Sequence, residues 1–141
     1  MKTTLKACST SPCKSHSLYD HYTESTRCQT RFFLPGLSIG AFKVITDGSS
    51  SGPTPATRDP YTSNGQDCGI LYWDQNGLDD LIGRVHRQGF QCVVHAVGDR
   101  AIEQTLHAMG RAQREFPRAG LRHRIEHCAN CPHDLCDRVR A

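Results

Sequence analysis

The hydrophobic pattern divides the chain into an irregular first part and a regular remainder. In residues 1–37, apolar positions repeat with neither the spacing of a strand nor that of a helix, and Ser, Thr, Cys and His are frequent. We therefore expect residues 1–37 to form a poorly ordered segment and residues 38–141 to form the folded domain. The first clear element follows Gly36, because Leu37 to Thr46 is rich in the apolar and β-branched residues that favour a buried strand.

Helices and strands alternate after this strand. Gly and Pro residues interrupt the stretch from Asp47 to about residue 68, which predicts a long loop. Apolar residues then recur at helical spacing from Leu78 to Val85. The elements predicted beyond this helix are a strand at Phe90 to His95, a helix from Gly98-Asp99 to about Glu115, a strand at Leu121 to His127 and a helix from Pro132. This order indicates an α/β protein of parallel βαβ units, in either an open doubly wound sheet or a closed (β/α)₈ barrel.

Composition and charge narrow the classes of function. A hydrophobic share of 37% is typical of globular proteins, and no apolar run approaches the roughly 20 residues of a membrane-spanning helix. No apolar export signal follows Met1, so we expect a cytoplasmic protein whose eight cysteines are reduced. The net charge is +3, and the late arginines lack interleaved aromatic residues, which favours a solvated helix surface over a nucleic-acid interface.

Candidate catalytic residues lie at the ends of the predicted strands, where parallel α/β folds form their active sites. His95 ends the second strand and His127 ends the third. Two imidazoles at neighbouring strand ends can bind one zinc ion, although each can also be merely a hydrogen-bonded pocket residue. Lys43 lies within the first strand and is costly to bury as an ammonium ion, so it is paired, for example with Asp47, or chemically modified.

Three segments give the sequence a specific character: GAFKVITDGSSSG, VVHAVGDRAIEQTLHAM and RHRIEHC, at 40–52, 93–109 and 122–128. In this order and spacing they resemble the amidohydrolase superfamily, and within it the amidohydrolase-3 group related to N-substituted formamide deformylase. The resemblance covers about residues 38–141. It implies a (β/α)₈ barrel with one or two divalent metals, usually zinc, that hydrolyses an amide-like C–N bond of a small molecule other than a peptide.

The resemblance also implies roles for individual residues. His95 and His127 match the metal-binding histidines after the family's fifth and sixth strands, and Lys43 matches the fourth-strand lysine that is carboxylated in many members. His123 competes with His127, since a spacing of four residues places both on one face of a strand. We prefer His127 because it stands at the strand end, which leaves His123 to support a metal ligand or to contact the substrate.

Three further residues are expected around this site. Asp99 and Arg100 match the GDRA turn of the family, and Asp99 is also suited to cap the helix that follows. Asp47 lies near the end of the first strand, on the same face as Lys43 by strand alternation.

The chain departs from the family pattern at both ends. The H-x-H pair of the first strand is absent, since His16 and His21 are five residues apart, and so is the aspartate after the eighth strand that acts as general base. We therefore expect about strands four to six of a barrel, with little or no hydrolase activity in isolation. Exposed sheet edges would then favour self-association.

A rival interpretation assigns metal binding to cysteines. Cys128-x-x-Cys131, with His133 and Cys136, has the spacing of a non-catalytic zinc-binding module. The same Cys128 and Cys131 pair is also compatible with a redox role.

Overall fold

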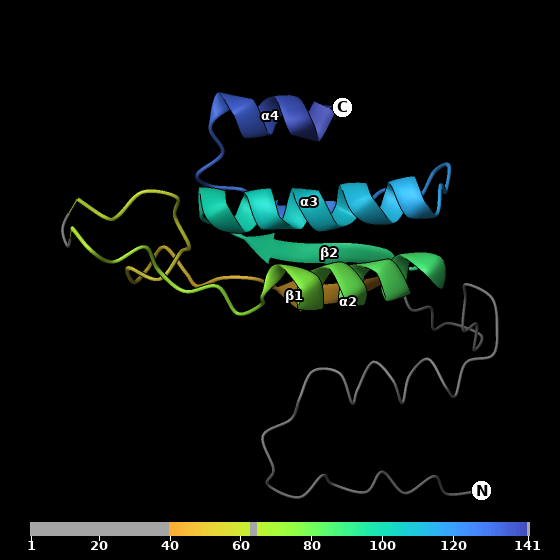
Figure 1. The fold of residues 1–141 in the computed structure, drawn as a ribbon, viewed down its shortest axis with the longest axis horizontal. Helices are drawn as coiled ribbons and strands as arrows, with labels where there is room; N and C mark the ends of the chain where they lie inside the picture. The colour runs from red at the N-terminus through yellow and green to blue at the C-terminus, as the bar shows by residue number, and fades with distance from the viewer. Residues whose placement is uncertain (1–39, 63–64, 141) are drawn as a thin grey trace, which may run out of the picture.

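The computed structural model describes residues 40–62 and 65–140 (Figure 1). The predicted segment 1–37 lies outside these residues. The elements are β1 (Ala41–Ile45), α2 (Gln75–Arg87), β2 (Gln91–Ala96), α3 (Asp99–Glu115), β3 (Arg124–His127) and α4 (His133–Arg140). The predicted alternation of strands and helices is confirmed, but β1 and β3 are shorter than the strands predicted from the sequence.

The three strands form one parallel sheet in the order β1-β2-β3. Ile45 of β1 lies opposite His95 of β2, and His95 lies opposite Glu126 of β3. The predicted parallel βαβ arrangement is therefore confirmed, and the C-terminal ends of the strands meet at one edge. No other strand among the described residues pairs with the outer edges of β1 and β3.

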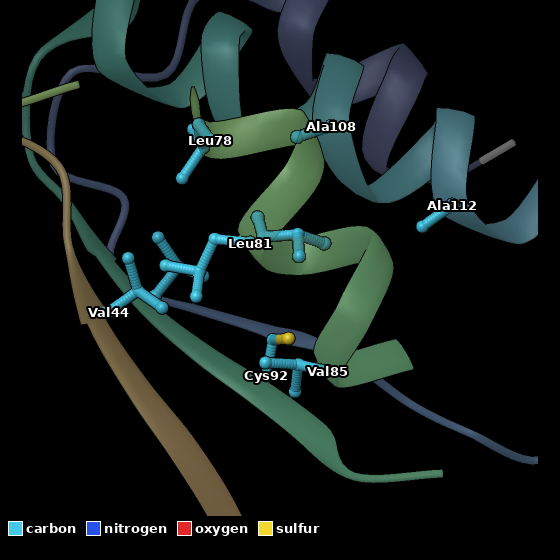
Figure 2. Close-up of a cluster of buried hydrophobic side chains, with 9 residues drawn as sticks. Val44, Leu78, Leu81, Val85, Cys92, Ala108 and Ala112 are labelled. Atoms are coloured by element: carbon cyan, nitrogen blue, oxygen red, sulfur yellow. The ribbon is translucent and has the colours of Figure 1, made fainter. Parts of the chain in front are cut away.

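Both long helices pack on the same face of the sheet. Val44, Cys92 and Val94 project from this face into a cluster with the apolar stripe of α2, which includes Leu81 and Val85 (Figure 2). Ala108 and Ala112 of α3 complete the cluster, and their small side chains let α3 approach α2 closely. A second cluster lies nearer the strand ends and contains Ala56, Ala96, Ala101, Ile102 and Leu135.

The opposite face of the sheet carries polar and charged side chains. Lys43, His95, Arg124 and Glu126 alternate onto it, and Ile45 on this face is 51% exposed. The helices thus cover one side of the sheet, while the side that carries Lys43 and Glu126 is open within the described structure.

Local signals explain where the helices begin. The Asp74 carboxylate caps α2 by accepting a hydrogen bond from the Gly77 amide at 2.6 Å. The N-cap of α3 is Gly98, so Asp99 is the first residue of the helix rather than its cap. In residues 40–62 and 65–140, no helix combines the length and the apolarity needed to cross a membrane.

Candidate functional site

Two histidine rings meet at the C-terminal ends of neighbouring strands. The ring centroids of His95 and His127 are 4.6 Å apart, and the rings lie edge to face. Regular alternation would turn His127 toward the helices, because it lies opposite the buried Ala96. Instead, His127 has a φ of 69°, in the left-handed region, and this conformation ends β3 with the two rings together.

The orientation of His95 is fixed by the loop after β1. Its Nε2–H donates a hydrogen bond to the Gly48 carbonyl oxygen at 3.0 Å, and Asp47 Oδ1 lies 3.6 Å from the same nitrogen. Because Nε2 carries the proton, the lone pair of the neutral ring is on Nδ1. A histidine that donates one ring N–H to a carbonyl and keeps the other nitrogen as an acceptor is arranged as metal-binding histidines are.

Asp47 joins the ends of β1 and β2 to the long loop. Its carboxylate is buried and accepts three backbone hydrogen bonds, from Ala56, Val97 and Gly98, at 3.0, 3.0 and 2.8 Å. Gly98 has no room for a side chain, since a Cβ atom there would lie 2.0 Å from the Ala56 carbonyl oxygen. The backbone N–H of Arg100 donates to the same oxygen. This network holds the strand ends on which His95 lies.

Lys43 pairs with Glu126 and not with Asp47, so the predicted Lys43–Asp47 ion pair is wrong. The Lys43 side chain is 44% exposed, because β1 presents it to the open face of the sheet. The hydrogen bonds from Lys43 and Arg124 bring the pKa of Glu126 down to about 2. Glu126 was missed from the sequence, although it alternates with Arg124 onto the face of β3 that Lys43 approaches.

The structure does not bring His123 to the strand-end pair. Its Nδ1 accepts a hydrogen bond from the Cys92 amide at 3.0 Å, and its Nε2 lies 2.8 Å from Nδ1 of His86 in α2. His86 Nε2 lies 2.7 Å from the Phe116 carbonyl oxygen. The expectation that His123 and His127 share one face is wrong, because the φ of His127 reverses the direction of its side chain.

Asp99 and Arg100 take part in the attachment of the loop. Asp99 Oδ1 accepts hydrogen bonds from the backbone amides of Arg58 and Arg100, at 2.8 and 2.9 Å. The Arg58 side chain continues to Glu103 of α3 and Asp134 of α4, at 3.0 and 2.8 Å. Asp99 therefore organises the backbone near the strand ends, as an acidic residue in the first turn of a helix is suited to do.

The cysteines of the C-terminal part lie around the turn between β3 and α4. Across residues 40–62 and 65–140, no three His, Cys, Asp or Glu side chains are grouped so that they could hold a metal ion. The predicted module of Cys128, Cys131, His133 and Cys136 is thus not assembled. Within the described residues, His95 and His127 likewise have no third His, Cys, Asp or Glu side chain grouped with them so that a metal ion could be held.

Comparison with known proteins places these features in a family. Residues 3–141 match the model of the amidohydrolase family. Over 105 residues, the chain is 30% identical to a Bacillus subtilis (strain 168) protein, YtcJ, that carries an amidohydrolase name. This alignment covers 74% of the chain and 19% of that curated relative, so the chain spans about a fifth of its length.

Solved structures agree in fold over most of the chain. An uncharacterised metal-dependent hydrolase from Pyrococcus furiosus superposes with a TM-score of 0.74 at 28% identity, covering 88% of this chain and 25% of that one. Its counterpart from Pyrococcus horikoshii OT3 has a TM-score of 0.71 at 26% identity, covering 89% and 24%.

Proposed function

The chain belongs to the amidohydrolase family, and on that premise we propose that it is part of a metal-dependent hydrolase acting on amide-like C–N bonds of small, non-peptide molecules. The observation that carries the proposal is the orientation of His95, whose Nε2–H is anchored on the Gly48 carbonyl while its ring lies against that of His127. Two imidazoles at adjacent strand ends form a donor set suited to zinc. We assign His95 and His127 as ligands of a divalent metal, with zinc as the expected ion.

Lys43 is the third proposed ligand, in its carboxylated form. In the structure its ammonium group is paired with Glu126. Carboxylation would replace the positive charge by a negative one, so the pair would have to separate before Lys43 could bind a metal. The ion pair between Lys43 and Glu126 would therefore break when carboxylated Lys43 binds the metal and completes the site.

A bound divalent metal would lower the pKa of a water molecule and polarise the scissile carbonyl. This chain's own contribution is to position the ligands. The Asp47 network fixes the ends of β1 and β2, and the Gly48 carbonyl holds the ring of His95 in one tautomer. His123 has no part in this arrangement, since both of its ring nitrogens are engaged elsewhere.

The arrangement of the strands and helices also supports a proposal for the architecture, the activity and the association of the chain. The consecutive order β1-β2-β3, with both helices on one face, is the order expected for part of a (β/α)₈ barrel. The open face with Lys43 and Glu126 would then line the barrel interior. We infer little or no turnover by the chain alone, and self-association through the outer edges of β1 and β3.

Metal analysis tests the assignment. Zinc per chain is measured by elemental analysis after dialysis against zinc, for wild type, His95→Ala/His127→Ala and Cys128→Ser/Cys131→Ser, with circular dichroism to confirm that each variant is folded. We expect the histidine variant to lose the metal and the cysteine variant to keep it, because the rings of His95 and His127 meet at the strand ends and the Gly48 carbonyl orients His95. Loss of metal in the cysteine variant alone would refute the assignment in favour of a zinc-binding module.

An activity assay tests the remaining part of the proposal. Wild type and the histidine variant are incubated with a panel of N-formyl, amide, urea and carbamate compounds. We expect little or no hydrolysis by either protein. Robust hydrolysis by wild type that is abolished in His95→Ala would show that the chain is sufficient for catalysis and would contradict the inference of inactivity.

A further inference from the structure

Two cysteine sulfurs approach each other at the turn that precedes α4. The Sγ atoms of Cys131 and Cys136 are 3.6 Å apart, and Cys136 Sγ lies 3.4 Å from the Cys131 carbonyl oxygen. A disulfide bond is about 2 Å long, so the sulfurs need to approach by a further ~1.5 Å. We propose that Cys131 and Cys136 are a site of reversible thiol oxidation, at which they form a disulfide that ties α4 to the turn before it.

Contacts on both sides of the turn hold the two thiols in place. Leu135, which lies between the two cysteines in the sequence, is fully buried. The Cys136 amide donates a hydrogen bond to the Pro132 carbonyl at 3.1 Å. Asp134 binds Arg58 at 2.8 Å, which anchors the start of α4 on the long loop. Because α4 is attached by packing and by an ion pair, the sulfurs stay near each other in the reduced protein.

Exposure separates the three cysteines near this turn. Cys136 is exposed and Cys131 is half-buried. Cys128 is half-buried like Cys131, and both pack against the apolar cluster around Leu135; Cys128 also has a φ of 48°, in the left-handed region. An oxidant from solvent therefore reaches Cys136 most readily. Cys92 provides an internal contrast, since it is fully buried and burial raises its pKa to about 12.

The proposed oxidation by a peroxide balances in two steps. The Cys136 thiolate attacks one oxygen of hydrogen peroxide and becomes a sulfenic acid, while the O–O bond breaks and hydroxide leaves; the proton that the thiol lost on ionisation converts this hydroxide to one water. The Cys131 sulfur then attacks the Cys136 sulfur, forming the S–S bond and releasing a second water. Two thiols lose two electrons and two protons in total, and the peroxide accepts both. A dithiol reductant reverses the result by thiol-disulfide exchange.

The protonation state of the thiols sets the rate. The pKa of both thiols is raised: for Cys131 the main cause is burial, and for Cys136 it is the hydrogen bond with Cys131. Because the thiolate is the reactive form, oxidation should become faster as the pH increases toward the pKa of the thiols.

Peptide mapping of the oxidised protein tests the site. The full chain is treated with hydrogen peroxide, alkylated with iodoacetamide under denaturing conditions and digested with trypsin. Cleavage after Arg124 and Arg138 gives one peptide that contains Cys128, Cys131 and Cys136. We expect this peptide to carry a single alkyl group, on Cys128, and to be two hydrogen atoms lighter at the other two cysteines, with full alkylation restored by dithiothreitol.

Two variants and one internal control make the outcome decisive. Cys128→Ser should retain the disulfide and Cys136→Ser should lose it, while the peptide with Cys92 should be alkylated in every sample. A disulfide between Cys128 and Cys131, a cross-link to a second chain, sulfinic acids without a disulfide, or three alkylated cysteines after peroxide would each overturn the proposal.

Discussion

Acidification should destabilise the fold through the hydrogen-bonded histidines His86 and His123. The Cys92 amide donates to Nδ1 of His123, so the proton of His123 is on Nε2 and is donated to Nδ1 of His86. The proton of His86 is then on Nε2 and is donated to the Phe116 carbonyl. Each ring nitrogen is therefore either a donor or an acceptor in these hydrogen bonds. A proton added to Nδ1 of His123 would point at the N–H of Cys92, which is itself a donor.

The pKa of His123 gives the size of the effect. Burial, together with the neighbouring His86, lowers this pKa from 6.5 to about 4. The unfolded chain therefore binds a proton as the pH falls below 6.5, whereas the folded chain binds it only near pH 4, so stability decreases as the pH falls through this window. Linkage gives a loss of roughly 2 kcal/mol between about pH 7.5 and pH 5, which we reduce to about 1 kcal/mol because the ring is only half-buried.

Urea denaturation at the two pH values measures this loss, with the fluorescence of Trp73, the single tryptophan, as the signal. In His123→Asn, the side-chain oxygen can still accept from the Cys92 amide, but no titrating ring remains. We expect a lower absolute stability and a pH dependence smaller by about 1 kcal/mol than in wild type. His133→Asn, at an exposed histidine, serves as the matched control and should have the same pH dependence of stability as wild type. An unchanged pH dependence in His123→Asn would refute the assigned hydrogen-bond chain.

Three other predictions concern the stability and the association of the chain. Asp47→Ala should lower the free energy of unfolding, measured by chemical denaturation, by about 3 kcal/mol or more, because it leaves three buried N–H groups without an acceptor. Asp80→Ala, at an exposed carboxylate, should lower it by under about 1 kcal/mol. Equal losses would contradict the role given to Asp47. Leu135→Ala should lower the free energy of unfolding by about 2 to 4 kcal/mol and increase hydrogen exchange in α4, since Leu135 is fully buried between α4 and α3. Unchanged hydrogen exchange in α4 would contradict this packing. Light scattering at increasing protein concentration should show association that weakens when the exposed Ile45 of the edge strand β1 is replaced by Lys. A concentration-independent monomer would rule out association through the sheet edges.

The fold was predictable from local patterns to the level of its elements. The apolar stripe from Leu78 to Val85 and the acidic cap at Asp74 are local signals, and α2 occupies that stretch. The position of His95 and His127 at neighbouring strand ends followed from the alternation of strands and helices. Element bounds were less accurate, because β1 and β3 extend only as far as their hydrogen-bonded partners.

The site could not be completed from the sequence, because its contacts depend on register and on backbone conformation. Glu126 pairs with Lys43 across 83 residues of sequence, through a register that no local pattern encodes. Strand alternation also misled, since it assumes a regular β conformation up to His127. The left-handed φ of that one residue separates it from His123.

By itself, the sequence determined the parallel βαβ order, the apolar faces of the helices and the residue types at the strand ends, because these depend on periodicity along a single segment. Only the tertiary structure decided which charges pair on the open face, that Asp47 binds backbone amides rather than Lys43, and that His123 is bonded to His86 while His95 meets His127. Such contacts join segments that are distant along the chain, and their geometry is set by the packing of the whole domain.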